Sequence, residues 1–168
     1  MGVVDAEIKS LAASVVALLQ KKELSLATAE SCTGGAVSQA ITSVPGCSSV
    51  MKGAVVAYHN DVKMNVLGVS PSSLSMHGAV SGEVAEQMVL GVARLLDARC
   101  AIATTGVAGP GGGSPEKPVG TVWIAAKVGD DVAVKLLSLK DCGREANVKQ
   151  TVLNTLLLIK EMLCRNTF

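Results

Sequence analysis

Residues 24–41 read Leu24-Ser-Leu-Ala-Thr-Ala-Glu-Ser-Cys-Thr-Gly-Gly35-Ala-Val-Ser-Gln-Ala-Ile41. The opening residues predict a short strand over about 24–29, and the polar segment after it carries two adjacent glycines, which favour a turn. The pattern then predicts a helix that ends near Ile41. A strand that enters a helix through such a turn is typical of α/β folds, so this stretch indicates the fold class.

The remaining pattern is consistent with that class. Residues 53–58 and 100–105 are continuous apolar runs, which suit strands buried on both faces. Two further runs, on either side of Gly129-Asp-Asp131, indicate a hairpin over 120–138. Helices are expected over about 8–22, 60–68, from Ser70, from Ser81, and over 143–164. We therefore predict one domain over residues 1–168, an α/β fold of the three-layer α/β/α sandwich type. Its mixed, partly parallel sheet is expected to end in an antiparallel hairpin followed by a helix.

Composition excludes several classes of protein. Hydrophobic residues make up 49% of the 168 residues, which is enough to build a core and excludes intrinsic disorder. The longest apolar runs, such as Leu156-Leu-Leu-Ile159, are far shorter than the ~20 residues of a membrane span. No signal-peptide pattern opens the chain, so we expect a cytoplasmic protein. A net charge of +1 with one Trp, one Tyr and one Phe argues against nucleic-acid binding.

The cysteines and histidines argue against metal and disulfide chemistry. The 5 cysteines contain no Cys-x-x-Cys pair, as is typical of reduced cytosolic thiols. Only His59 and His77 are present, so sites that need several imidazoles are excluded. No pair of carboxylates has a spacing that suggests metal ligation, and we expect no metal.

Three polar or glycine-rich segments follow the predicted strands: 30–35, 58–63 and 105–113. Ligands of open α/β sheets bind at the carboxyl ends of the strands, so these segments predict one site. In the first segment, Ser31 stands where a nucleophile would, beside N–H groups that suit an anion or oxyanion. Alternatively, the turn only caps a helix, or Cys32 is the nucleophile, although the arginine-closed cradle of a phosphatase-like cysteine is missing.

The second segment contains a candidate general base. If Asn60 is the N-cap, Lys63 is the third helical residue and lies in the positive end of the helix dipole. That position, together with partial burial, would lower the pKa of Lys63 toward the range of a general base. The alternative is an exposed surface lysine. Tyr58 is either a catalytic group or a half-buried ring with a satisfied hydroxyl.

The third segment, Gly106 to Gly113, matches neither the phosphate loop nor the dinucleotide fingerprint. It forms either part of a site or simply a tight connection that needs positive φ. Arg144 opens the last helix, where it binds phosphate or is an exposed helix-start arginine. His59 and His77 leave a Ser-His-Asp triad formally open.

Several of these segments together resemble a known family. The motifs are Thr28-Ala-Glu-Ser-Cys-Thr-Gly-Gly35, Tyr58-x-Asn60-x-x-Lys63, Leu67-Gly-Val69, His77-Gly-Ala-Val-Ser81 and Gly106-Val-Ala-Gly-Pro-Gly-Gly-Gly-Ser-Pro-Glu-Lys-Pro-Val-Gly-Thr-Val-Trp123. They resemble the CinA C-terminal-domain family, whose stand-alone members are nicotinamide-nucleotide amidases. The resemblance covers roughly residues 5 to 163. The chain departs from the family's pattern at His59, where serine is usual, and at Lys149, where arginine is common.

The resemblance implies an amidohydrolase of pyridine-nucleotide salvage. The reaction would convert nicotinamide mononucleotide to nicotinate mononucleotide and ammonia, without metal or cofactor, in a homodimer or higher homo-oligomer. The catalytic group would be Ser31 as nucleophile, Lys63 as base, and Tyr58 and Thr105 in support. The expected substrate contacts are Glu30, Thr33, Gly34, Gly35, Asn60, Gly106 and Arg144. The alternatives are a non-catalytic nucleotide-binding module and an amidohydrolase for another small amide.

Overall fold

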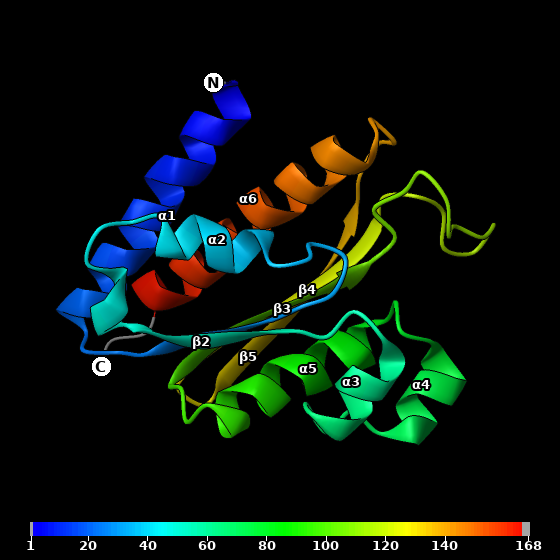
Figure 1. Cartoon of the computed structure of the whole chain (residues 1–168), viewed down its shortest axis with the longest axis horizontal. Helices are drawn as coiled ribbons and strands as arrows, with labels where there is room; N and C mark the ends of the chain where they lie inside the picture. The colour runs from blue at the N-terminus through cyan, green and yellow to red at the C-terminus, as the bar shows by residue number, and fades with distance from the viewer. Residues whose placement is uncertain (1, 166–168) are drawn as a thin grey trace.

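The computed structural model describes residues 2–165 as a five-stranded sheet between two layers of helices (Figure 1). The strands are β1 (Leu26–Glu30), β2 (Met51–Val56), β3 (Cys100–Gly106), β4 (Thr121–Val128) and β5 (Asp131–Ser138). The helices are α1 (Val3–Lys21), α2 (Ala36–Thr42), the 3-10 helix η1 (Cys47–Ser49), α3 (Asn60–Asn65), α4 (Pro71–His77), α5 (Gly82–Leu95) and α6 (Arg144–Arg165). The predicted α/β class is therefore confirmed, whereas the single-domain organisation stays a prediction.

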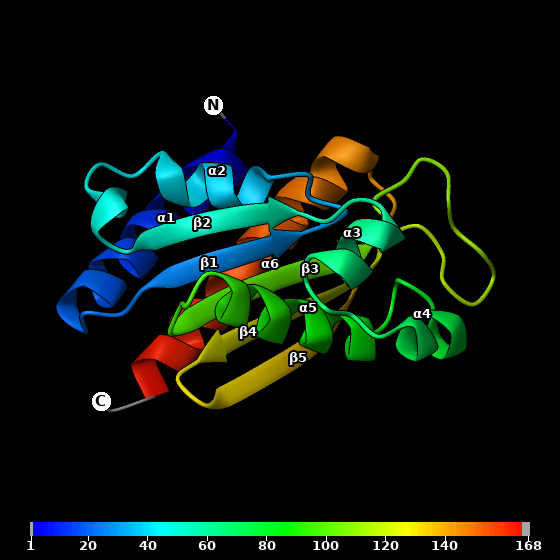
Figure 2. The same cartoon turned by 60° about the horizontal axis from the view of Figure 1, so that its bottom comes forward.

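The sheet has the order β2-β1-β3-β4-β5. β1 pairs in parallel with β2 and β3, because the connections between these strands are helical crossovers. β4 and β5 are antiparallel, as predicted for the hairpin. Figures 1 and 2 show α1, α2 and α6 on one face, and α3, α4 and α5 on the other.

Alternation along β1 divides its side chains between these two layers. Leu26 belongs to the core cluster that α1 and α6 cover, whereas Ala27 and Ala29 belong to the cluster beneath α5. The small alanine side chains let α5 lie close to the sheet. Because successive side chains of a strand point to opposite faces, this register also determines which residues at the end of β1 face each layer.

Two local predictions were wrong. The run 53–58 was expected to be buried on both faces, but β2 is an edge strand in which exposed residues such as Lys52 and Val56 alternate with partly buried ones. Its apolar character therefore did not reveal its position in the sheet. The N-cap of α3 is His59 and not Asn60, because the His59 imidazole accepts the N–H of Asp61. Lys63 is therefore the fourth helical residue.

Candidate active site

The carboxyl ends of β1, β2 and β3 meet around a small cavity of about 220 Å³. The predicted site residues that line it are Ser31, Tyr58, Asn60, Lys63, Thr105, Gly106 and Arg144. The other lining residues are Cys32, Ala79, Val80 and Ala108. The structure thus brings together segments that are far apart in the sequence, at the edge where ligands of α/β sheets bind.

Ser31 and Lys63 form the polar centre of this cavity. The Ser31 Oγ lies 3.1 Å from the Lys63 Nζ. The Lys63 Nζ also donates to the carbonyl oxygens of Ala57, at 2.8 Å, and Tyr58, at 3.3 Å. The Lys63 side chain is only 1% exposed, and this burial lowers its pKa below the ordinary value because the charged ammonium loses its hydration.

Arg144 and Tyr58 lie at the mouth of the cavity. The Arg144 Nη2 donates to the Tyr58 hydroxyl at 2.8 Å, and its Nη1 donates to the Gly109 carbonyl at 3.0 Å. Tyr58 is 59% exposed. The guanidinium therefore connects the start of α6 with the glycine-rich loop that follows β3, and it is accessible to an anionic ligand.

Thr105 lines the cavity with its hydroxyl already engaged. Its Oγ1 donates to the Ala79 carbonyl at 2.7 Å, which ties the end of β3 to the segment before α5. A second hydrogen bond joins α6 to the loop after β3, since the Asn147 Nδ2 donates to the Ala108 carbonyl at 3.1 Å. Asn147 was not predicted from the sequence, because its neighbours at helical spacing, Gln150 and Thr151, are also polar and nothing in the pattern marks it as buried.

The competing nucleophile and base are not favoured by the geometry. Cys32 is buried, and burial raises its pKa to about 12, so it is a protonated thiol at neutral pH. Neither His59 nor His77 lines the cavity. His59 contacts Asp61, and His77 lies 3.8 Å from Glu83. The two histidines are thus not placed to activate Ser31.

A family model for the CinA C-terminal domain matches residues 8–163. The chain belongs to this family. A CinA-like protein of Amoebophilus asiaticus (strain 5a2) is 45% identical over 146 residues, which cover 87% of this chain and 35% of that protein. The chain therefore spans about a third of the length of the curated relatives it matches.

Solved structures of CinA proteins share the fold. The competence/damage inducible protein CihA from Agrobacterium tumefaciens has a TM-score of 0.90 at 39% identity, covering 94% of this chain and 96% of that one. A CinA superfamily protein from Escherichia coli has a TM-score of 0.89 at 30% identity, covering 98% and 94%. Across residues 2–165 of this CinA domain, no helix is long and apolar enough to cross a membrane. The same residues contain no cluster of three or more His, Cys, Asp or Glu side chains that could hold a metal ion.

Four predicted substrate contacts of this CinA domain lie outside the cavity lining: Glu30, Thr33, Gly34 and Gly35. The Glu30 side chain points toward α2 and accepts the N–H of Gly35 and the hydroxyl of Thr33. The N–H of Gly34 donates to the Ser31 carbonyl. The Glu30 carboxylate, the Thr33 hydroxyl and the N–H groups of Gly34 and Gly35 are thus engaged in building the turn, and substrate contact by these four residues stays a prediction.

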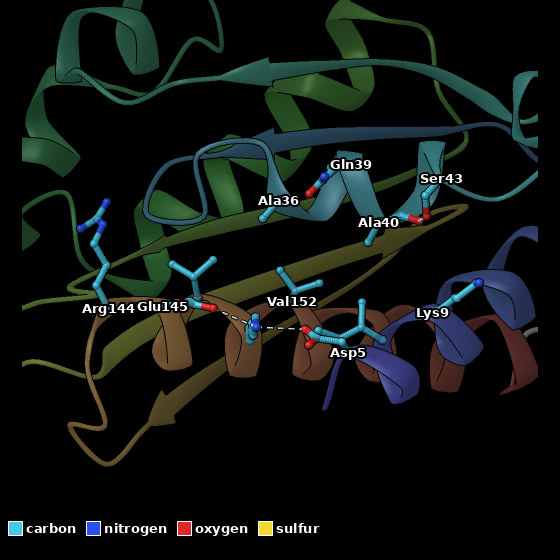
Figure 3. Close-up of a pocket in the computed structure, with 12 residues that line it drawn as sticks. Asp5, Lys9, Ala36, Gln39, Ala40, Ser43, Arg144, Glu145 and Val152 are labelled. Carbon is cyan, nitrogen blue, oxygen red and sulfur yellow. Dashed lines mark hydrogen bonds and ion pairs between the residues drawn. The ribbon is translucent and has the colours of Figure 1, made fainter. Parts of the chain in front are cut away.

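A larger groove of about 790 Å³ lies between α1, α2 and α6 (Figure 3). Its polar centre is the Lys149 ammonium, which pairs with Asp5 at 3.1 Å and with Glu145 at 2.9 Å. The pair with Asp5 joins the start of α1 to α6, whereas the pair with Glu145 lies within α6. Arg144 lies at one end of the groove and also lines the smaller cavity, so the two hollows are neighbours.

Proposed function

We propose that this chain is an amidohydrolase that converts nicotinamide mononucleotide to nicotinate mononucleotide and ammonia, with Ser31 as nucleophile and Lys63 as base. The observation that carries the proposal is the buried Lys63 Nζ placed 3.1 Å from the Ser31 Oγ. A serine activated by a neutral lysine performs acyl transfer without a histidine.

The two carbonyl contacts of Lys63 favour this role. A neutral amine has two N–H donors, which the Ala57 and Tyr58 carbonyls accept. Its lone pair is then left for the Ser31 hydroxyl. The lowered pKa of Lys63 makes this neutral form accessible nearer to neutral pH.

The proposed reaction has two stages. The Ser31 Oγ bonds to the carboxamide carbon while its proton passes to the Lys63 Nζ. The carbon–nitrogen bond then breaks, and the same proton leaves with the nitrogen as ammonia, so that an ester on Ser31 remains. Water, deprotonated by Lys63, attacks the ester and releases nicotinate mononucleotide with Ser31 restored.

The rest of the cavity suits a nucleotide with one small ring. The cavity volume of about 220 Å³ is sufficient for the pyridine carboxamide, and in the proposed complex the ribosyl phosphate extends toward Arg144. The guanidinium would bind the phosphate, with Tyr58 in support. The Glu30 carboxylate accepts the N–H groups of Gly35, Val37 and Ser38, and the Ser31 carbonyl accepts that of Gly34. The N–H groups of Cys32 and Thr33 are therefore the candidate donors to the oxyanion.

The rival candidates are a non-catalytic nucleotide-binding module and an amidase for another small amide. A binding module has no use for a buried lysine that contacts a serine hydroxyl, because burying such a group is costly. We further propose a cytoplasmic homodimer or higher homo-oligomer that needs neither metal nor cofactor.

Ammonia release from nicotinamide mononucleotide tests the proposal. We expect release by the wild-type protein, and its loss in Ser31→Ala with the circular dichroism spectrum unchanged. Binding of the nucleotide without release would favour the binding module. If the protein neither binds the nucleotide nor releases ammonia, another substrate is favoured. Normal ammonia release by Ser31→Ala would exclude Ser31 as nucleophile.

A further inference from the structure

Glu30 is a buried carboxylate that immediately precedes the proposed nucleophile, Ser31, in the sequence. Its side chain is 1% exposed, and it accepts hydrogen bonds from five groups. The donors are the hydroxyls of Thr28 (3.4 Å) and Thr33 (2.7 Å) and the N–H groups of Gly35 (3.1 Å), Val37 (3.0 Å) and Ser38 (2.7 Å). Four of these five donors belong to the turn after Ser31 and the first turn of α2.

The Glu30 side chain has hydrogen-bond donors but no cationic partner among the described residues. Within residues 2–165, the Glu30 carboxylate has no salt bridge with a lysine, arginine or histidine. Hydrogen-bond donors alone therefore compensate for its burial. The Thr33 hydroxyl has one proton, which it gives to Glu30, so the Thr104 hydroxyl, 2.7 Å away, donates to Thr33 in turn.

The same turn holds the backbone of Ser31. The N–H of Ser31 donates to the Thr104 carbonyl at 2.9 Å, and the Ser31 carbonyl accepts the N–H of Gly34 at 3.0 Å. Glu30 thus binds the residues on the far side of the turn, while Thr104 is connected both to Ser31 and, through Thr33, to Glu30. Strand alternation directs the Glu30 side chain to the α2 layer and the Ser31 side chain toward α3.

We propose that Glu30 is a positioning residue for Ser31, which fixes the turn so that the Ser31 Oγ stays within reach of the Lys63 Nζ. This inference rests on the proposed function of Ser31 and Lys63. Glu30 is not among the residues that line the cavity. Its loss therefore lowers the reactivity of Ser31 and leaves substrate affinity unchanged.

The deciding variant is Glu30→Gln, which keeps the size of the side chain. One carboxylate oxygen becomes an NH₂ group, which faces N–H donors and cannot accept their hydrogen bonds. The matched control is Thr42→Ala, which removes a hydroxyl contact of the same helix α2 to the Ser38 and Gln39 carbonyls and leaves the turn intact. Melting temperatures and circular dichroism report folding in both variants.

Two experiments report the positioning of Ser31. The first measures kcat and KM for nicotinamide mononucleotide, and the second measures the rate at which a small fluorophosphonate labels Ser31 covalently. In the labelling reaction the Ser31 Oγ bonds to phosphorus, fluoride leaves, and the serine proton passes to Lys63. We expect both kcat and the labelling rate of Glu30→Gln to fall on the order of 10²-fold, as for a displaced catalytic group. KM and the pH at half-maximal rate stay at wild-type values, and Thr42→Ala retains both rates.

Each other outcome counts against the proposal. A raised KM with normal kcat would show that Glu30 contacts substrate, and a folded Glu30→Gln with a normal labelling rate would show a role in stability alone. If Glu30→Gln does not fold, Thr33→Val decides in its place, because it removes one donor and keeps the carboxylate; an unchanged labelling rate would then refute positioning. A wild-type protein that labels at Ser31 but releases no ammonia refutes the proposed substrate only, since the labelling rates still test Glu30.

Discussion

Replacement of Lys63 by methionine separates the catalytic role of this residue from its effect on stability. Lys63→Met keeps the length and most of the volume of the side chain in a site that is 1% exposed. It removes the group that takes the Ser31 proton at 3.1 Å. A positioned general base contributes about 10²–10⁴-fold to a rate, so we expect kcat for ammonia release to fall by that factor.

The stability of the same variant has a sign that follows from the lowered pKa of Lys63. Between that pKa and the ordinary value of 10.5, the unfolded chain binds a proton at Lys63 that the folded chain does not. The free energy of unfolding of the wild type therefore rises with pH in this window, by at most about 1.4 kcal/mol per pH unit. Below the window the buried ammonium disfavours folding; above it the penalty is absent.

Lys63→Met lacks this proton, so the rise with pH disappears. The measurement is urea unfolding of both proteins across neutral to alkaline pH, compared as a difference because other groups, such as Lys149 with its raised pKa, affect both alike. The activity of the wild type should fall as pH drops through the lowered Lys63 pKa. Near-normal ammonia release by Lys63→Met would refute its role as base, and an unchanged stability difference across the window would refute its perturbed pKa.

Three further substitutions test the cavity and the core. Arg144→Gln should raise KM for nicotinamide mononucleotide more than it lowers kcat, because it removes the proposed phosphate contact; steady-state kinetics with a wild-type KM would contradict that. Cys32→Ala should keep most of the ammonia release, since the Cys32 pKa is raised to about 12; loss of ammonia release in a folded variant would instead favour the Cys32 thiol as nucleophile. Gly91→Ala should destabilise the fold by about 1–3 kcal/mol in urea unfolding, because the added Cβ would overlap the Leu67 carbonyl, and wild-type stability would show that α5 can shift away from the segment between α3 and α4.

The sequence was informative where local pattern determines structure. Strand and helix positions followed from apolar runs and turn residues, and the three segments at the strand ends met in one cavity because parallel strands place their carboxyl ends together. The edge position of β2 was not predictable in this way, since strand order depends on long-range pairing. Ala79 and Val80, which also line the cavity, were not predicted as site residues for a different reason, because their side chains carry no chemical signal.

Glu30 shows what strand geometry adds to the motif. The family resemblance implies that Glu30 contacts substrate, as Ser31 would, whereas the Glu30 side chain is not part of the cavity lining. The period-2 alternation of a strand was sufficient to separate the two, since neighbours on β1 face opposite layers. What the sequence alone lacked was the identity of the layer on each side, which depends on α2 folding back over one face and α3 over the other.

Lys63 and Glu30 are both buried on either side of Ser31, but their surroundings have opposite chemistry. Five donors surround the Glu30 carboxylate, whereas the Lys63 amine contacts two carbonyls and one hydroxyl, and burial lowers its pKa. A fixed anion can hold a turn in place, and an amine that loses its proton easily can accept one from serine. The neutral Lys63 on which the proposed chemistry depends is therefore obtained at a cost in folding free energy below its pKa, and the pH dependence of stability measures that cost independently of any substrate.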